Sequence, residues 1–483
     1  MNRLSEVRLK INEILTALSH SYKEISMLKL NKIAFGVILS MSLAGCANIS
    51  DSYQASQDDY KQYEDITNQY NIKENWWSLY NDAQLNRVVE QALLNNKDLA
   101  KAAISVNSAL YQANLLGADL VPSFSGSTSS SASRRTDTGA NSTISHGGSL
   151  NVSYTLDLWR RLANAADAGE WNYKATQQDL EATRLSLINA VVVTYYQIAY
   201  LNDAISATND SIDYYSRINS IMQNRLNQGV EDRASTDQAQ QSVLTARNNL
   251  ISYQTQRKTA EQTLRNLLNL KPDAPLNINF PHILNVKTTP VNLNVPVSTI
   301  ANRPDVRGNL FRLSSAFKDA KAMQKAWFPT ISLGGSMSSS NNKVSNAFEN
   351  PTAAGTLGIS LPFLDWNHVK WNVKISEAAY ETARVNYEQG ITTALNEVDT
   401  NYFAYNQAVQ NFSNLQRKYD YDKRITQYYQ NRYNAGVSEL REWLNAANTE
   451  KTSQVSILNA KYSVIQNENA IYSSMGGYYS PKF

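Results

Sequence analysis

The residue types that most often carry out chemistry are scarce in this chain of 483 residues. It has one cysteine and four histidines, which stand at least 86 residues apart: His20, His146, His282 and His368. Local metal-binding spacings such as HExxH are therefore absent, and one cysteine excludes an internal disulfide or a multi-cysteine zinc site. Serine, histidine and acidic residues form no recognisable nucleophile motif, and no glycine pair precedes the lysine of a P-loop. We expect no enzyme, no metal and no cofactor.

The single cysteine lies where a lipid would be attached. The segment 27–46 begins with a positive region, continues with an apolar run of 11 residues (33–43) and ends in Leu-Ala-Gly-Cys. Because a bilayer takes about 20 apolar residues, this run is too short to span it and indicates a secretory signal. Its last four residues resemble a bacterial lipobox, and Ala47 indicates sorting to the outer membrane. We expect residues 1–45 to be removed, with Met27 a candidate for the true start, and Cys46 to be acylated; a buried core cysteine is the alternative.

The charge of the chain becomes balanced once this signal is removed. The whole sequence has a formal net charge of +3, and only 18% of its residues are charged, compared with about 25% in soluble domains. Residues 46–483 contain 39 basic and 39 acidic residues. The basicity thus belongs to the precursor, and we expect no nucleic-acid binding.

Landmark residues recur at a constant offset of 207 residues, which indicates an internal duplication. They are Asp98 and Asp305, Pro122 and Pro329, Trp159 and Trp366, Tyr195 and Tyr402, Arg225 and Arg432, and Gly229 and Gly436. Each half has the same expected order of helix, β-hairpin, long helix, turn and helix. The first repeat is expected over 82–270 (β-hairpin 122–158, tip turn 227–232), and the second over 303–475 (β-hairpin 329–366, tip turn 434–438). The other segments are 46–81 at the start, a connector at 271–302 and a tail at 476–483.

The long helical stretches, about 159–227 and 367–434, carry apolar residues seven apart. Examples are Val191, Ile198, Ile205 and Ile212, and then Ile391, Val398, Tyr405, Phe412 and Tyr419. At 1.5 Å per residue, about 68 residues reach on the order of 100 Å, so we expect rods that pack side by side. Two antiparallel coiled-coil hairpins that act as a spacer would explain these heptads equally well.

The hairpin segments show a different period, because apolar residues occupy every second position. They include Leu150, Val152, Tyr154 and Leu156, then Ile331, Leu333 and Met337, and Leu357, Ile359 and Leu361. Period two over roughly ten residues is typical of transmembrane β-barrels, whose apolar side faces lipid. A soluble hairpin packed on a core is the alternative. Four strands cannot close a barrel, because lipid offers no partner for edge amides and about eight strands are the usual minimum. We therefore expect oligomers; three copies would supply twelve strands and twelve tube helices, although counting alone also permits two or four.

Taken together, these features resemble the TolC-type outer-membrane factors, especially their lipoprotein branch. The resemblance covers essentially all of the mature chain and rests on the lipobox, the NWWSLYND segment (75–82), the prolines before the strands, the paired DLW and LDW motifs (157–159 and 364–366) and the paired tips NQGV (227–230) and NAGV (434–437). It implies a mainly α chain with a β-barrel part: a trimeric 12-stranded outer-membrane barrel that continues into a long periplasmic α-helical barrel. The ends and the connector would form an equatorial belt.

The same resemblance implies a function. The chain would be the outer-membrane channel of a tripartite efflux pump in a Gram-negative bacterium and would passively conduct drugs, toxic compounds or metal ions. Its partners would be a periplasmic adaptor, an inner-membrane pump of the RND type and outer-membrane lipid, with further copies in a homotrimer. An exit duct for type I protein secretion is the first alternative. A lipid-anchored coiled-coil structural protein or adhesin without a pore is the second.

The resemblance also implies a gate at the periplasmic end. Aligned on Gly436, Glu442 takes the position of the first acid of the family's aperture ring, Asn445 replaces the second, and Tyr433 matches a gate tyrosine, with Glu439 one turn away. Aligned on the glycine of the first half, Ser235 takes the position of that tyrosine's acidic partner. We expect these five side chains to form the gate; ordinary solvated helix charges are the alternative for the two glutamates.

The two glycine turns are expected to contact the adaptor through Arg225, Gly229, Val230, Arg432, Gly436 and Val437. The glycines most simply end helices in a left-handed conformation that other residues adopt at a cost. The arginines, four residues earlier, are expected to cap carbonyl groups or to pair with acids of the adaptor.

Overall fold

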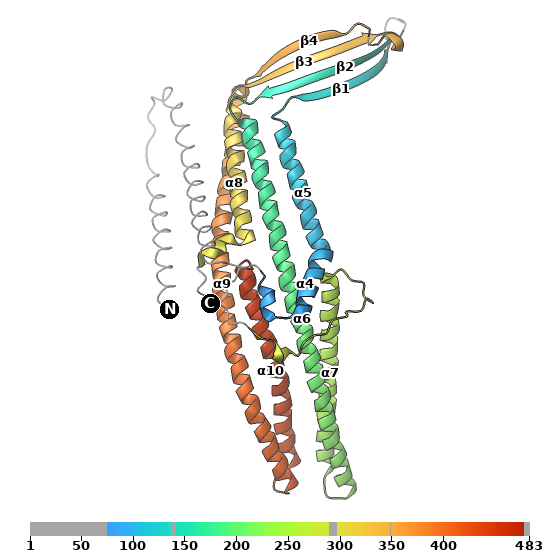
Figure 1. Cartoon of the computed structure of the whole chain (residues 1–483), viewed down its shortest axis with the longest axis vertical. Coiled ribbons are helices and arrows are strands. Elements are labelled where there is room, and N and C mark those ends of the chain that lie inside the picture. The colour runs from blue at the N-terminus through green and yellow to red at the C-terminus, as the bar shows by residue number, and fades with distance from the viewer. Residues whose placement is uncertain (1–74, 135, 137–141, 289–296, 348, 478–483) are drawn as a thin grey trace, which may run out of the picture. The chain divides into compact units, whose positions relative to one another are not determined.

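The computed structural model describes residues 75–134, 136, 142–288, 297–347 and 349–477, all within one compact unit, residues 55–483 (Figure 1). The predicted signal region, the lipidation site at Cys46, most of segment 46–81 and most of the tail lie outside the described residues. Among the described residues, no helix is both long enough and apolar enough to cross a membrane.

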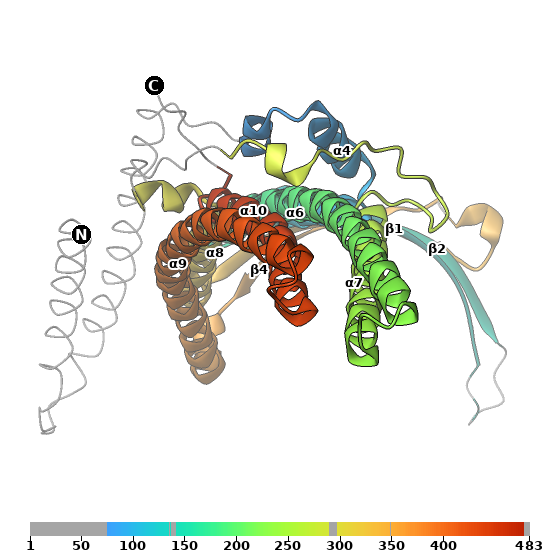
Figure 2. The same ribbon diagram turned by 90° about the horizontal axis from the view of Figure 1, so that it is seen from below.

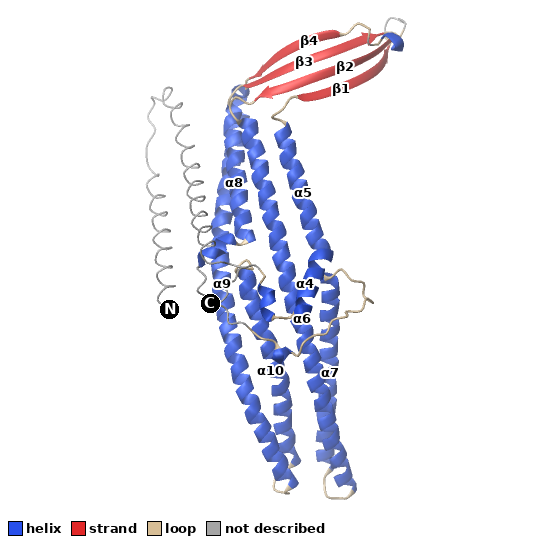
Figure 3. Ribbon diagram, in the orientation of Figure 1, coloured by secondary structure: helices blue, strands red, loops and turns tan. Residues whose placement is uncertain are grey.

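The described elements follow the same order twice (Figure 3). The first half contains η1 (Trp76–Tyr80), α4 (Ala83–Asn95), α5 (Lys97–Ala118), β1 (Ser123–Ser133), β2 (Thr143–Leu156), α6 (Arg161–Asn227) and α7 (Arg233–Leu267). The connector contributes η2 (Ile283–Asn285) and η3 (Val297–Asn302). The second half contains α8 (Pro304–Gln324), η4 (Lys325–Trp327), β3 (Thr330–Asn341), η5 (Val344–Asn346), β4 (Thr352–Ser360), η6 (Pro362–Asp365), α9 (Trp366–Asn434) and α10 (Leu440–Ser474).

The first repeat was expected to begin with one helix before its β-hairpin, but the structure has two, α4 and α5. The helical stretch is broken at Asn96, whose backbone is extended and whose side chain accepts hydrogen bonds from the amides of Asp98 (2.9 Å) and Leu99 (3.0 Å). An asparagine that satisfies the free amides of a first turn is a typical helix N-cap, so a second helix begins there. The amide group of Asn96 also donates to the carbonyl of Leu267 (3.0 Å), which fixes the break against the end of α7.

The four strands form one antiparallel sheet in the order β1-β2-β3-β4, so the hairpins of the two halves join at β2 and β3. The register places Gly126 opposite Leu150, Leu150 opposite Met337, and Met337 opposite Ala353. Because side chains alternate along each strand, the large apolar residues share one face of the sheet. Several of them remain exposed in the single chain, among them Phe124 at 81% and Leu357 at 66%.

The helices pack around α6, which contacts α5 and α8 along one part of its length and α7 and α10 along the other. The remaining long helix, α9, contacts α8 and α10. Figures 1 and 2 place α5 and α7 at one edge of this arrangement and α9 at the opposite edge. The sheet lies beyond the helix ends opposite the two glycine turns (Figure 1).

Two apolar clusters hold the helices together. The larger joins η1, α4, α6 and α10 and includes Trp76, which is fully buried and donates to Asn469 Oδ1 (2.6 Å). The heptad residues Val191 and Ile198 of α6 belong to it, whereas Ile205 is half-buried. The heptad residues of α9 are also only half-buried, because α9 lies at an edge of the chain.

Candidate functional site

Both long helices end in the same capping geometry at the glycine turns. Gly229 and Gly436 each have φ of +72°, which confirms the predicted left-handed helix ends. The amide of Val230 donates to the carbonyl of Arg225, and the amide of Val437 to that of Arg432, both at 3.0 Å. This is the six-to-one hydrogen bond of a Schellman motif, which satisfies carbonyls at the helix end.

The two turns are linked through Tyr433. Its hydroxyl donates to Glu231 Oε2 (3.0 Å), and the same oxygen lies 3.4 Å from Arg225 Nε. The guanidinium of Arg225 also lies over the Tyr433 ring, 5.3 Å from its centre. Tyr433 is 7% exposed, and burial together with the bond to Glu231 raises the pKa of Tyr433 to about 12. We call Tyr433, Glu231 and Arg225 the tip latch.

The predicted partner of Tyr433 was Ser235, and this is wrong. The amide of Ser235 donates to Asp232 Oδ1 (2.8 Å), so the serine lies in the capped first turn of α7. That bond, with a further one from the serine side chain, lowers the pKa of Asp232. The alignment on Gly229 assumed that the first turn of this chain follows the family's turn, whereas here the loop directs Glu231 toward Tyr433 on α9.

An apolar cluster surrounds the tip latch and joins α6, α7, α9 and α10. The ring of Trp443 packs against Tyr433 with centres 5.4 Å apart, and its Nε1 donates to the hydroxyl of Tyr214 on α6 (2.9 Å). Each side chain is at most partly exposed, and burial raises the pKa of Tyr214. Glu231, Trp443 and Tyr214 were not predicted from the sequence. Their only signals there are an acid two residues after a turn glycine and a tryptophan at an apolar position of α10.

The other predicted gate residues lie on the exposed start of α10. Glu439 precedes the helix and pairs with Arg441 (3.4 Å), Glu442 accepts a hydrogen bond from Ser438, and Asn445 is exposed. The structure gives none of these three a contact with Tyr433 within the described residues. Their role around an aperture stays a prediction.

The two tip arginines behave differently. Arg432 Nη2 donates to the carbonyl of Val437 (3.0 Å), which lies in the turn beyond the end of α9, and its Nη1 donates to the hydroxyl of Tyr428 (3.2 Å). The arginine thus bonds to the turn, not to the last carbonyls of the helix as predicted. Arg225 instead pairs with Glu231. Val230 and Val437 are both about three-fifths exposed at the turns.

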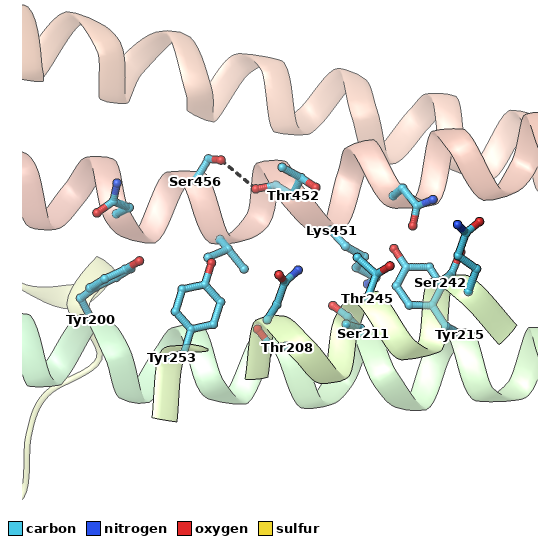
Figure 4. Close-up of a pocket in the computed structure, with 16 residues that line it drawn as sticks. Tyr200, Thr208, Ser211, Tyr215, Ser242, Thr245, Tyr253, Lys451, Thr452 and Ser456 are labelled. Carbon is cyan, nitrogen blue, oxygen red and sulfur yellow. Dashed lines mark hydrogen bonds between the residues drawn. The ribbon is translucent and has the colours of Figure 1, made fainter. Parts of the chain in front are cut away.

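A polar groove of about 490 Å³ separates the tip cluster from the larger cluster (Figure 4). Figure 4 shows Tyr200 and Tyr215 of α6, Tyr253 of α7 and Lys451 of α10 along it, together with several serines and threonines. Its lining contains no acid or histidine, and the described part of the chain has no group of three or more potential metal ligands. The groove is thus lined mainly by hydroxyl and amide groups between α7 and α10.

Comparison with known families identifies the family of the chain. The profile of a family described as Outer membrane efflux protein matches the chain twice, over residues 88–270 and 295–477. The second match follows the first by the 207 residues that relate the landmarks of the two halves. The chain belongs to the outer membrane efflux protein family. Two internal repeats are thereby confirmed.

Relatives and solved structures agree with this membership. An uncharacterized protein of Haemophilus influenzae is 72% identical and matches 94% of this chain and all of its own length. Toxin and drug export protein A of Aggregatibacter actinomycetemcomitans is 70% identical, also over 94% of this chain and all of its own length. The crystal structure of the outer membrane protein VceC of Vibrio cholerae has the same fold, with a TM-score of 0.76 at 20% identity over 84% of this chain and 98% of VceC.

The predicted fold class is confirmed for the single chain: it is mainly α with a β part, the fold of the solved outer-membrane channels to which it is similar. The predicted function and location are also confirmed in outline. The chain is an outer-membrane channel for efflux from a Gram-negative cell and has a large periplasmic part. A coiled-coil spacer or adhesin without a pore is not favoured.

Proposed function

We propose that three copies of this chain close into one tube, latched at its periplasmic end, and that the tube receives drug-like solutes from an RND-type inner-membrane pump through a periplasmic adaptor. A lipid on Cys46 would add an anchor in the outer membrane. The observation that carries the proposal is that one chain has two pairs of complementary edges, one in the sheet and one in the helices, that sister copies would cover.

The first pair of edges belongs to the sheet. β1 and β4 are its outer strands, so each has one row of backbone groups without a strand partner among the described residues. The large apolar face indicates that the sheet lies in lipid, where such groups cost several kcal/mol each when unpaired. Pairing β1 of one copy with β4 of the next removes every edge if the ring closes. Three copies supply the twelve strands that suit the family's fold.

The second pair of edges belongs to the helices. On α5, Ile104, Tyr111 and Leu115 are each about two-thirds exposed and recur at helical spacing. On α9 at the opposite edge, Trp371 and Ile375 are similarly exposed. Nearer the turns, exposed apolar side chains again lie on both edges: Leu244 and Ile251 on α7, and Tyr421, Ile425 and Tyr428 on α9. Apolar stripes at both edges support head-to-tail packing of sister copies.

The tip latch supplies the closed state of the tube. It joins the α6–α7 pair to the α9–α10 pair at the turns, and the Trp443–Tyr214 hydrogen bond joins them again one to three helical turns away. Between these contacts and the larger apolar cluster lies the polar groove, which separates part of α7 from α10. An adaptor that grips the exposed turns would separate the helix pairs and break the tip latch first.

The substrate class is proposed from a relative that is 70% identical and whose name states a cargo. Toxin and drug export protein A shares 70% of its residues with this chain, which supports drugs as cargo. Because that name also states a toxin, secretion of a protein toxin is the second candidate. Neither cargo requires a catalytic residue in the tube.

Deletion of the gene tests the proposal, with susceptibility to a panel of drugs and the secreted proteins measured in parallel. We expect lower inhibitory concentrations for several drugs, restored by the wild-type gene. Restoration must fail with Leu115→Lys, which places a charge on the α5 edge. Unchanged susceptibility together with loss of one secreted protein would instead support the second candidate.

A further inference from the structure

The face of the sheet opposite the apolar residues has an unusual composition. All six odd-numbered positions of β1, from Ser123 to Ser133, are serine. The register continues these rows onto Thr, Ser, Gly and Asn of β2, onto Thr, Ser and Gly of β3, and onto Thr, Ala, Gly and Ser of β4. One row, for example, contains Ser127, Ser149, Ser338 and Thr352. We call these positions the hydroxyl face.

The hydroxyl face contains no ionisable side chain. The four strands have no aspartate, glutamate, lysine or arginine at all. Their single histidine, His146, pairs with Ser130, and by the alternation of the strand both lie on the apolar side. In the first half, charged residues lie just outside the strands, for example Asp157 and Arg160 after the end of β2.

The hydroxyls are arranged as a continuous polar surface rather than as isolated side chains. Ser127 and Ser149 are joined by a hydrogen bond of 2.9 Å, and Ser145 and Ser340 by one of 2.8 Å, so the surface crosses from β1 to β3. Even the glycine positions are covered: a Cβ at Gly334 would collide with the hydroxyl of Thr356. Water or cargo at this face would therefore meet hydroxyl groups along the length of the strands.

From this we infer that the barrel section conducts without charge selection: its lining is neutral and hydrogen-bonding, and it accepts polar cargo of either charge sign or of none. The inference rests on the proposed trimer, in which the apolar face contacts lipid and the hydroxyl face lines the bore. A hydroxyl both donates and accepts hydrogen bonds, so it solvates cations, anions and neutral polar groups alike. Selection by charge in channels comes from rings of ionised side chains, and the four described strands contribute none to this face.

The small size of the lining residues adds to this. Bore width for a given number of strands depends on the side chains that fill the interior, and Ser, Thr, Gly, Ala and Asn fill little of it. The barrel section would thus pass bulky cargo and leave discrimination to the helical part and to the periplasmic tips.

A charge-insertion experiment in planar bilayers tests the inference, using the full-length protein with Tyr433→Phe to release the tip latch. In this background we expect Ser149→Asp to raise the potassium-to-chloride permeability ratio and Ser149→Lys to lower it by a similar factor, each about twofold or more. Ser149→Thr is the matched neutral control and should leave the ratio unchanged. A response to only one sign, or to neither, would overturn the inference.

Cysteine labelling in isolated outer membranes separates this inference from the proposed trimeric duct. A water-soluble maleimide should label Ser149→Cys and spare Leu150→Cys, its neighbour on the other face, above the baseline set by the parental protein with Cys46 alone. Equal labelling, or the reverse preference, would refute the assignment of the faces. Correct labelling without any conductance would instead refute the proposed conducting trimer and leave the neutral face in place.

Discussion

The substitution Tyr433→Phe should release the closed periplasmic end while preserving the packing around it. Phenylalanine keeps the ring that contacts Trp443 and lies beneath the guanidinium of Arg225. It removes the hydroxyl, which donates to Glu231 at 3.0 Å and lies 3.4 Å from the sulfur of Met222 on α6. The change therefore tests the polar contacts of this one hydroxyl.

The size of the effect follows from the charge and burial of this bond. A hydrogen bond to a charged group contributes about 1.5–3 kcal/mol. We use the lower value because the carboxylate of Glu231 still has Arg225 as an ion-pair partner at 3.4 Å after the change. With tenfold for each 1.4 kcal/mol, three copies that open together would shift the ratio of open to closed channels by about 1,000-fold.

Single-channel recording in planar bilayers measures this ratio directly. Tyr428→Phe is the matched control, because it removes a hydroxyl of an exposed tyrosine on the same helix, and the donor to that hydroxyl within the described residues is Arg432 (3.2 Å). We expect long open events in Tyr433→Phe and wild-type behaviour in the control. If the two variants give the same traces, the tip latch does not hold the channel closed.

Four further outcomes are expected. In the latched structure the pKa of Tyr433 is raised to about 12 from its ordinary 10. Between pH 10 and 12 the tyrosine therefore loses its proton more readily when the latch is open, so wild-type conductance should rise in this range, and the Phe variant should show no such rise. Trp443→Phe, which removes the donor to a tyrosine hydroxyl on α6, should weaken the closed state by about 1 kcal/mol per chain in the same recordings. Leu115→Lys should reduce the trimer fraction in light scattering of the detergent-solubilised protein. Gly229→Ala should lower the free energy of unfolding by about 1 kcal/mol because φ is +72° there, whereas Gly117→Ala, in open space within α5, should not lower it.

The fold was largely predictable because its signals are local and repeat. Period-two segments marked the strands, heptads marked α6 and α9, and the glycines at 229 and 436 marked the helix ends. The break between α4 and α5 was missed although Asn96 is a good N-cap, because the apolar period continues across it. Because the capping side chain of Asn96 also donates to the carbonyl of Leu267, tertiary packing helps to set the position of this helix break.

The candidate site was less predictable because its contacts cross the two halves. Tyr433 was identified through resemblance, but its partner Glu231 lies 202 residues away, and Trp443 meets Tyr214 across 229 residues. Which acid reaches the tyrosine depends on the path of a short loop, and alignment on Gly229 does not specify that path. A residue pair that joins two repeats is therefore fixed only when the helices are packed.

The number of copies is the most direct test of the proposed tube. Native mass spectrometry of the full-length protein, extracted from the outer membrane in mild detergent, should give a mass of three chains, each of the mature length. A predominantly monomeric species at concentrations that preserve the fold would contradict it, since the edges of β1, β4, α5 and α9 would then need no sister copy.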